Sequence, residues 1–172
     1  MKRSSPIPDL TCDNSERNQL NQISAYIDGT TVYGTTQQLN DELREKNSPL
    51  LKKSDIFTSA GHGETLPVSS RFKCPLSMLA DLEGCFSAGD LRVNENAGLT
   101  SMHTLFMREH NRVAKQLEDI NPNWEPDTIY NEARLIIIAM HQVITYKGTY
   151  ELFFFVTKFQ RDRIFDFLTV II

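Results

Sequence analysis

Two long helical patterns joined by a short proline-containing linker most constrain the fold of this 172-residue chain. In the first, six side chains step by three or four residues and share one helix face: Leu99, Met102, Phe106, His110, Val113 and Leu117. Asn121-Pro122 ends it, because proline disfavours a helical conformation in the residue before it. The second starts at Pro126-Asp127-Thr128, with an expected inner face of Ile129, Ala133, Ile136, Met140 and Val143 or Ile144. The fold is therefore expected to be mainly α.

The remaining segments predict few or no strands and long loops. Residues 1–16 are polar and form an irregular N-terminal arm, and residues 22–34 form either a short strand or an extended loop. A short helix follows Thr36 over residues 37–44, whereas residues 47–73 lack periodicity and indicate a long surface excursion. The second long helix is nearly apolar all round up to Tyr146, as in a helix buried in a larger core, and Lys147-Gly148 then interrupts it. Residues 147–172 form a tail of different character.

Charge and hydropathy exclude several classes of function. The net charge of −4 gives no attraction to nucleic acid, and charged residues interrupt every apolar window long enough to span a membrane. The first residues include a basic pair without a following apolar stretch, so no secretory signal is expected in this chain. The glycine-rich nucleotide-binding motifs and the common hydrolase motifs do not occur.

The first candidate site has the spacing Ser24-x-Tyr26-x-Asp28-x-Thr30. In an extended segment alternate side chains face the same side, so the oxygens of Ser24, Asp28 and Thr30 point one way. The backbone carbonyl of Tyr26 can join them, and converging oxygen donors suit calcium. The alternative is a polar strand face without a metal.

The second candidate site is Arg92 with Glu95, which are three residues apart and share one face of a helical turn. The alternative is a surface salt bridge. His103 and His110 are two helical turns apart, too far to hold one metal by themselves. His110 and His141 are interpreted as hydrogen-bonded core histidines.

The cysteines allow two interpretations. Cys12, Cys74 and Cys85 could all be reduced, buried thiols. A bridge between Cys74 and Cys85 could instead close a short loop that has Pro75 and Gly84 at its ends, which would indicate an oxidising compartment.

Taken in order, these segments resemble the animal haem peroxidase family. The matching pieces are four ordered motifs: Arg17 to Gly34 with its Ser-Ala-Tyr-Ile-Asp-Gly-Thr core, Cys85 to Asn96, Leu99 to Arg112, and the helix from Tyr130 to Tyr146. Together they define a partial haem peroxidase domain over residues 17–146. The resemblance implies the central, helical portion of such a domain.

The resemblance also implies roles for individual residues. Arg92 matches the arginine of the distal haem pocket, Glu95 the glutamate that forms an ester with haem b, and Asn96 stands where some members have a sulfonium-forming methionine. The calcium ligands of the family match Ser24, Tyr26 (by its carbonyl), Asp28 and Thr30, and a family disulfide matches Cys74 and Cys85. Hydrogen peroxide, a small reducing substrate and an extracellular or secretory location follow from the same likeness.

Two histidines of the family pattern have no counterpart in this chain. The distal histidine would precede the calcium loop and the proximal histidine would follow the helix ending near Tyr146, and neither His103 nor His110 matches them. Two hypotheses result: a haem peroxidase that uses hydrogen peroxide, or a truncated, non-catalytic fragment that acts as a calcium-binding or interaction module. Under the first, Arg92 and Glu95 should face a porphyrin cavity.

Overall fold

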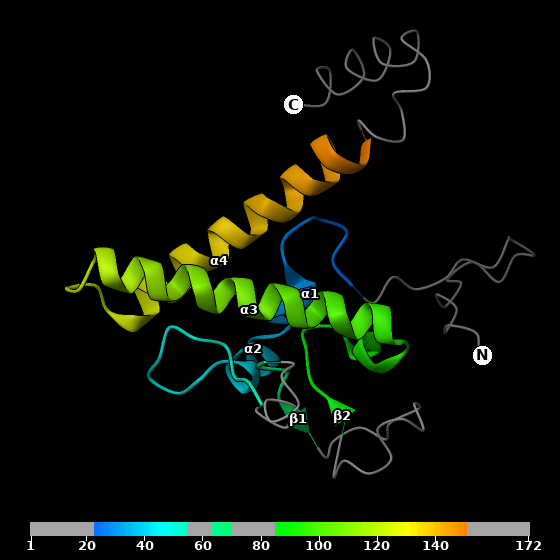
Figure 1. Cartoon of the computed structure of the whole chain (residues 1–172), viewed down its shortest axis with the longest axis horizontal. Helices are drawn as coiled ribbons and strands as arrows, with labels where there is room; N and C mark the ends of the chain where they lie inside the picture. The colour runs from blue at the N-terminus through cyan, green and yellow to red at the C-terminus, as the bar shows by residue number, and fades with distance from the viewer. Residues whose placement is uncertain (1–22, 55–62, 70–84, 151–172) are drawn as a thin grey trace, which may run out of the picture.

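The computed structural model describes residues 23–54, 63–69 and 85–150 of the chain. Two helices dominate these residues, α3 (Ala97–Ile120) and α4 (Pro126–Val143). Figure 1 shows α4 starting beside the C-terminal end of α3 and running at an angle to it. The end of α4 keeps contacts with the other described residues, because His141 packs against Phe106 of α3 and Gln142 donates to the Ile27 carbonyl at 3.0 Å. The mainly helical fold expected from the sequence is confirmed.

The apolar face of α3 differs from the expected one in its N-terminal half. His110 and Val113 are buried as predicted. In the first turns of the helix, however, His103 and Met107 are buried, whereas the predicted Met102 is 51% exposed. The prediction for Met102 was therefore wrong by one position. Successive residues are about 100° apart around a helix, so a one-residue shift remains compatible with the same spacing.

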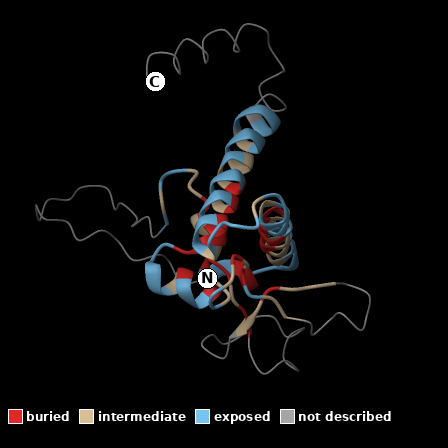
Figure 2. Cartoon of the chain, turned by 90° about the vertical axis from the view of Figure 1, so that its left-hand side faces the viewer, coloured by how far each residue is buried: buried red, intermediate tan, exposed pale blue. Residues whose placement is uncertain are grey.

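The inner face and the end of α4 also differ from expectation. Ile129, Ala133 and Ile137 are buried, whereas Ile136 is 40% exposed. The helical chain does not stop at Lys147-Gly148, because a π-helical segment, η4 (Ile144–Tyr150), continues it. Figure 2 shows this end of the helix mostly exposed within the described residues. The expected burial on all sides was wrong. Three large apolar side chains at this end are exposed: Val143, Ile144 and Tyr146.

Short elements pack beneath α3. They are α1 (Thr30–Tyr33), α2 (Gln37–Leu43), the 3-10 turn η3 (Leu91–Asn94) and two strands, β1 (Val68–Ser69) and β2 (Cys85–Phe86). The strands pair antiparallel, with Val68 opposite Phe86. The helix expected after Thr36 is confirmed, with the Thr36 hydroxyl accepting from the Leu39 amide. The segment that was expected to be extended instead forms α1 at its end.

Part of the predicted surface excursion belongs to the core. Leu51 and Leu66 are each only 3% exposed. The side chain of Asn111 on α3 fixes this loop, because it accepts from the Leu51 amide at 2.7 Å and donates to the Leu51 carbonyl at 3.0 Å. These buried leucines follow no regular spacing, so the sequence pattern did not predict that the loop packs into the core.

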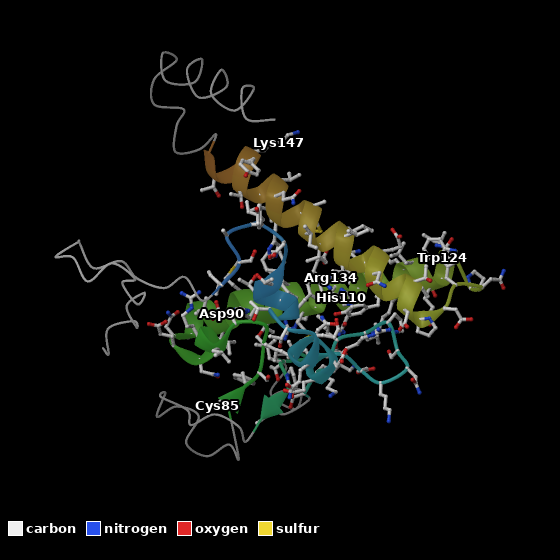
Figure 3. All side chains as sticks on the ribbon, turned by 180° about the vertical axis from the view of Figure 1, so that it is seen from behind. Cys85, Asp90, His110, Trp124, Arg134 and Lys147 are labelled. Atoms are coloured by element: carbon white, nitrogen blue, oxygen red, sulfur yellow. The ribbon has the colours of Figure 1, made fainter. Side chains whose placement is uncertain are left out.

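A buried polar network joins the short helices to α3 and α4. His110 is fully buried, and its ring lies between Pro49 and Tyr33: Nε2 is 3.0 Å from the Pro49 carbonyl and Nδ1 is 2.9 Å from the Tyr33 hydroxyl. Asn40 donates to the Tyr33 carbonyl and to the Tyr130 hydroxyl. The interpretation of His110 as a hydrogen-bonded core histidine is confirmed. The Arg134 guanidinium lies over the Tyr33 ring, and the edge of that ring meets His110; Figure 3 labels Arg134 and His110.

Several expectations fall outside the described residues. These are the N-terminal arm over residues 1–16, most of the tail over residues 147–172, and Cys12 and Cys74. Among the residues that the structure does describe, no helix combines the length and apolar character needed to cross a bilayer.

Candidate functional site

The turn that carries Arg92 is held at both ends. The Asp90 carboxylate caps its start by accepting from the Arg92 amide at 2.9 Å. Buried Asn94 exchanges two hydrogen bonds with the backbone of Phe86 on β2, at 3.0 and 2.7 Å. The Thr100 hydroxyl donates to the Val93 carbonyl at 2.6 Å. These contacts fix η3 between the strand pair and the first turn of α3.

The Arg92 side chain folds back onto Asp90. Its Nε donates to Asp90 Oδ1 at 3.1 Å and its Nη2 to Oδ2 at 2.6 Å, a fork geometry that matches the two carboxylate oxygens. The hydrogen bonds from Arg92 hold the pKa of Asp90 below its usual value, and Asp90 in turn raises the pKa of Arg92. The arginine side chain is 59% exposed, so its other donors face outward.

Glu95 follows Arg92 on the same turn. Its amide donates to the Arg92 carbonyl at 2.8 Å, and its charge contributes to the raised pKa of Arg92. Both side chains are exposed. The structure therefore brings together the two residues that the sequence paired.

Asn96 has a structural use that the sequence analysis did not assign to it. It is the N-cap of α3, and its side chain accepts from the Leu99 amide at 2.9 Å. An asparagine directly before a helical pattern is the signal that could have identified this role.

The four candidate calcium ligands lie in the bend before α1 and at its first residue. Asp28 Oδ1 accepts from the Thr30 amide at 3.1 Å, and Ser24 Oγ accepts from the Tyr26 amide at 3.1 Å. Burial would raise the pKa of Asp28, but hydrogen bonds from Ser24 and Thr30 keep it below its usual value. One carboxylate, two hydroxyls and a carbonyl form a set of hard oxygen donors, which fits calcium but falls short of the six to eight ligands it takes.

The three described histidines face the interior. His103 is 7% exposed and bonds the backbone of Thr31. His141 stacks edge-on against Phe106 with ring centroids 4.0 Å apart, and its buried Nε2 has no hydrogen-bond partner within the described part of the chain. The interpretation of His141 as a hydrogen-bonded core residue was therefore wrong at Nε2. Within the described residues no group of three or more His, Cys, Asp or Glu side chains could hold a metal ion.

Neither Arg92 nor Glu95 lines either of two cavities found among the described residues. A groove of about 380 Å³ lies elsewhere, lined by Gly63, Glu64, Leu105, Arg108, Glu109 and Arg112. A second, much smaller cavity of about 10 Å³ is lined partly by His103 and Met107. Any wall opposite Arg92 would have to come from chain beyond the described residues.

Cys85 is fully buried and disulfide-bonded. Cys74, its expected partner, lies outside the described residues, so the pairing stays a prediction. Figure 3 shows Cys85 at β2.

Sequence comparisons give the chain its relatives. A family model described as animal haem peroxidase matches residues 1–149. The chain is 42% identical over 152 residues to the human protein called probable oxidoreductase PXDNL, which covers 84% of this chain and 10% of that protein. It is 41% identical over 138 residues to mouse eosinophil peroxidase, covering 78% of this chain and 19% of that protein. The chain thus spans a fifth or less of these relatives.

Solved structures agree with the sequence comparisons. Peroxidase A of Dictyostelium discoideum matches with a TM-score of 0.63 and 31% identity, over 76% of this chain and 25% of that one. A fatty acid alpha-dioxygenase of Arabidopsis thaliana shares the fold, with a TM-score of 0.58 at 23% identity over 81% of this chain and 19% of that one. The family model and the peroxidase relatives together show that the chain belongs to the animal haem peroxidase family.

Proposed function

We propose that this chain contributes the arginine side of the haem pocket to an oxidoreductase that uses hydrogen peroxide, with Arg92 in the distal pocket and Glu95 as the haem-ester residue. The observation that carries the proposal is the fixed turn of η3. It presents an exposed guanidinium and an exposed carboxylate from one helical turn, in a member of the animal haem peroxidase family.

The chemistry of Arg92 suits peroxide cleavage. Negative charge develops on the leaving oxygen as the O–O bond breaks, and an oriented guanidinium stabilises that charge. Arginine remains protonated at any working pH, and the ion pair with Asp90 strengthens this further. Because Asp90 accepts from only two of the guanidinium N–H groups, Arg92 keeps donors that could bind a peroxide oxygen.

Glu95 and Arg92 would face the haem together. When bound, the haem supplies the redox chemistry of peroxide reduction. The Glu95 carboxylate is exposed and lies three residues after Arg92, one turn further along the chain, which suits an ester to the rim of the porphyrin. Asn96 caps α3 in the position of the sulfonium-forming methionine, so we expect no second covalent link.

We further infer that the Ser24, Tyr26, Asp28 and Thr30 segment supplies four oxygen ligands to calcium. Supporting this, Ser24 and Thr30 both bond Asp28, whose lowered pKa keeps it anionic. A Cys74–Cys85 disulfide and an extracellular or secretory location fit the disulfide at Cys85. Hydrogen peroxide and a small reducing compound are the proposed substrates.

The test is a chimera, defined as peroxidase A of Dictyostelium with its matching segment replaced by residues 23–146 of this chain. With haem and calcium added, we expect a Soret band and peroxide-dependent oxidation of a phenolic substrate. Arg92→Gln should keep the Soret band and lose about 10²–10³ in kcat. A folded chimera that takes up no haem would exclude the proposal.

A second candidate is a non-catalytic calcium-binding or interaction module. It is favoured by the histidines of the described region, because His103 bonds Thr31 and His110 bonds Tyr33 and Pro49, which leaves neither available as an axial ligand. The 172-residue chain itself tests it. Peroxide turnover well above that of free haem, abolished by Arg92→Gln, would exclude the module.

A further inference from the structure

We propose that Asp90 is a positioning residue that aims the Arg92 guanidinium, and that α1 holds the Asp90 backbone in place through Gly89. This inference rests on the proposed function of Arg92. It assigns no direct contact with substrate to Asp90, which acts only through Arg92.

Two ion pairs of similar shape differ in how far their carboxylates are buried. Arg112 also makes a forked pair, with Glu109, but it joins residues one turn apart on the outer surface of α3. The Asp90 carboxylate is only 8% exposed, against 22% for Glu109, while Arg92 and Arg112 are exposed to a similar degree. A more buried carboxylate is less screened by water, so its hold on the arginine is stronger.

The Asp90 backbone has little freedom to move. The preceding residue, Gly89, lies directly against α1: a Cβ there would be 2.3 Å from the Thr30 carbonyl oxygen and 2.5 Å from the Gly34 nitrogen. Only glycine permits this approach. The Asp90 carboxylate then caps η3 through the Arg92 amide. One side chain therefore fixes both the backbone and the guanidinium of Arg92.

His103 on α3 contacts the same helix, α1. It is buried and bonds the backbone of Thr31 on α1. Burial lowers the pKa of His103, which disfavours a charged ring, and Arg92 is the cation that bonds Asp90. His103 thus ties α3 to α1, the helix against which Gly89 lies.

The consequence is a guanidinium with a defined orientation. Two of its five N–H groups donate to the Asp90 carboxylate. The other three make no hydrogen bond to any described residue, and they point away from the carboxylate. Without Asp90, the exposed side chain would sample several rotamers, and its donors would have no fixed direction.

The experiment uses the ¹⁵N-labelled 172-residue chain without haem. NMR measures the exchange of the Arg92 Nε–H proton with water, and the signal is assigned by its loss in Arg92→Lys. Asp90→Asn should accelerate this exchange about tenfold or more, while the Arg112 Nε–H is unchanged. Glu109→Gln is the matched control and should show the reverse pattern.

Asp90→Ser provides a second variant, because its hydroxyl can still cap η3 but cannot form the fork. Exchange at Arg92 that stays slow in a folded Asp90 variant would overturn the proposal, as would equal acceleration at Arg92 and Arg112. The measurement needs no haem, so its failure is distinct from failure of the proposed function. Slow exchange that depends on Asp90 would stand even if the chimera bound no haem.

Discussion

Lowering the pH should destabilise the chain through His110. Its Nε2 donates to the Pro49 carbonyl, so its Nδ1 accepts from the Tyr33 hydroxyl and the ring is neutral. Burial lowers the pKa of His110 to about 4. The unfolded chain, with an ordinary pKa near 6.5, takes up a proton first as the pH falls. Stability is therefore fully present above pH 6.5 and is lost as the pH falls toward the folded value.

The magnitude follows from the difference between the two pKa values. A shift of one unit corresponds to about 1.4 kcal/mol, so His110 contributes at most about 3 kcal/mol, of which about 2 kcal/mol is lost between pH 7 and pH 5. Burial also lowers the pKa values of His103 and His141, and their losses add in the same direction. The His110→Gln variant separates the contribution of His110 from theirs.

The assay is urea unfolding followed by far-UV circular dichroism at the two pH values. The loss of unfolding free energy on acidification should be about 2 kcal/mol smaller in His110→Gln than in the unmodified chain. The NMR titration of the His110 ring provides a direct check. A midpoint near 6.5 in the folded chain would refute the reasoning, because it would mean that the ring is hydrated rather than enclosed.

Three further outcomes are expected. Tyr33→Phe should cost about 1–3 kcal/mol in urea unfolding, because it leaves buried His110 without its donor; Tyr26→Phe, at an 83% exposed residue, should change stability by less than about 0.5 kcal/mol. Gly89→Ala should destabilise by at least about 3 kcal/mol, because its Cβ would overlap the backbone of α1, whereas Gly148→Ala has open space and should be neutral by thermal melting. Calcium should raise the free energy of unfolding by up to about 3 kcal/mol when free calcium is a hundredfold above Kd, measured as a higher melting temperature, and Asp28→Asn should abolish the effect.

The long helices were predictable because their periodic patterns extend over several turns. The start of α3 and its end before Pro122 follow local rules of capping and proline geometry. The side of the helix that is buried was less predictable. His103 is buried because it meets the distant residue Thr31, and spacing along one helix does not contain that information.

Segments without periodicity gave the larger errors. The β-branched run before Gly34 favours a strand, but the side chain of Asp28 accepts from the Thr30 amide where α1 begins. Leu51 is buried because Asn111, sixty residues away, binds its backbone. Long-range partners of this kind override local propensity.

The candidate site shows the same division. Arg92 and Glu95 were paired by their spacing and do share a turn. Asp90 and Asn94, which fix that turn, were not singled out, although an aspartate before a helical turn is a capping signal. The contact of Asn94 with β2 has no signal in the sequence.

The most direct measurement of the central claim is peptide mapping of the chimera by mass spectrometry. The chimera is incubated with haem and with hydrogen peroxide as the oxidant, and then digested. The haem should be bound covalently to the peptide that contains Glu95, and Glu95→Gln should remove this link while the Soret band persists. Haem linked to another peptide of this segment, or bound without any link at Glu95, would contradict the placement of η3 at the porphyrin rim.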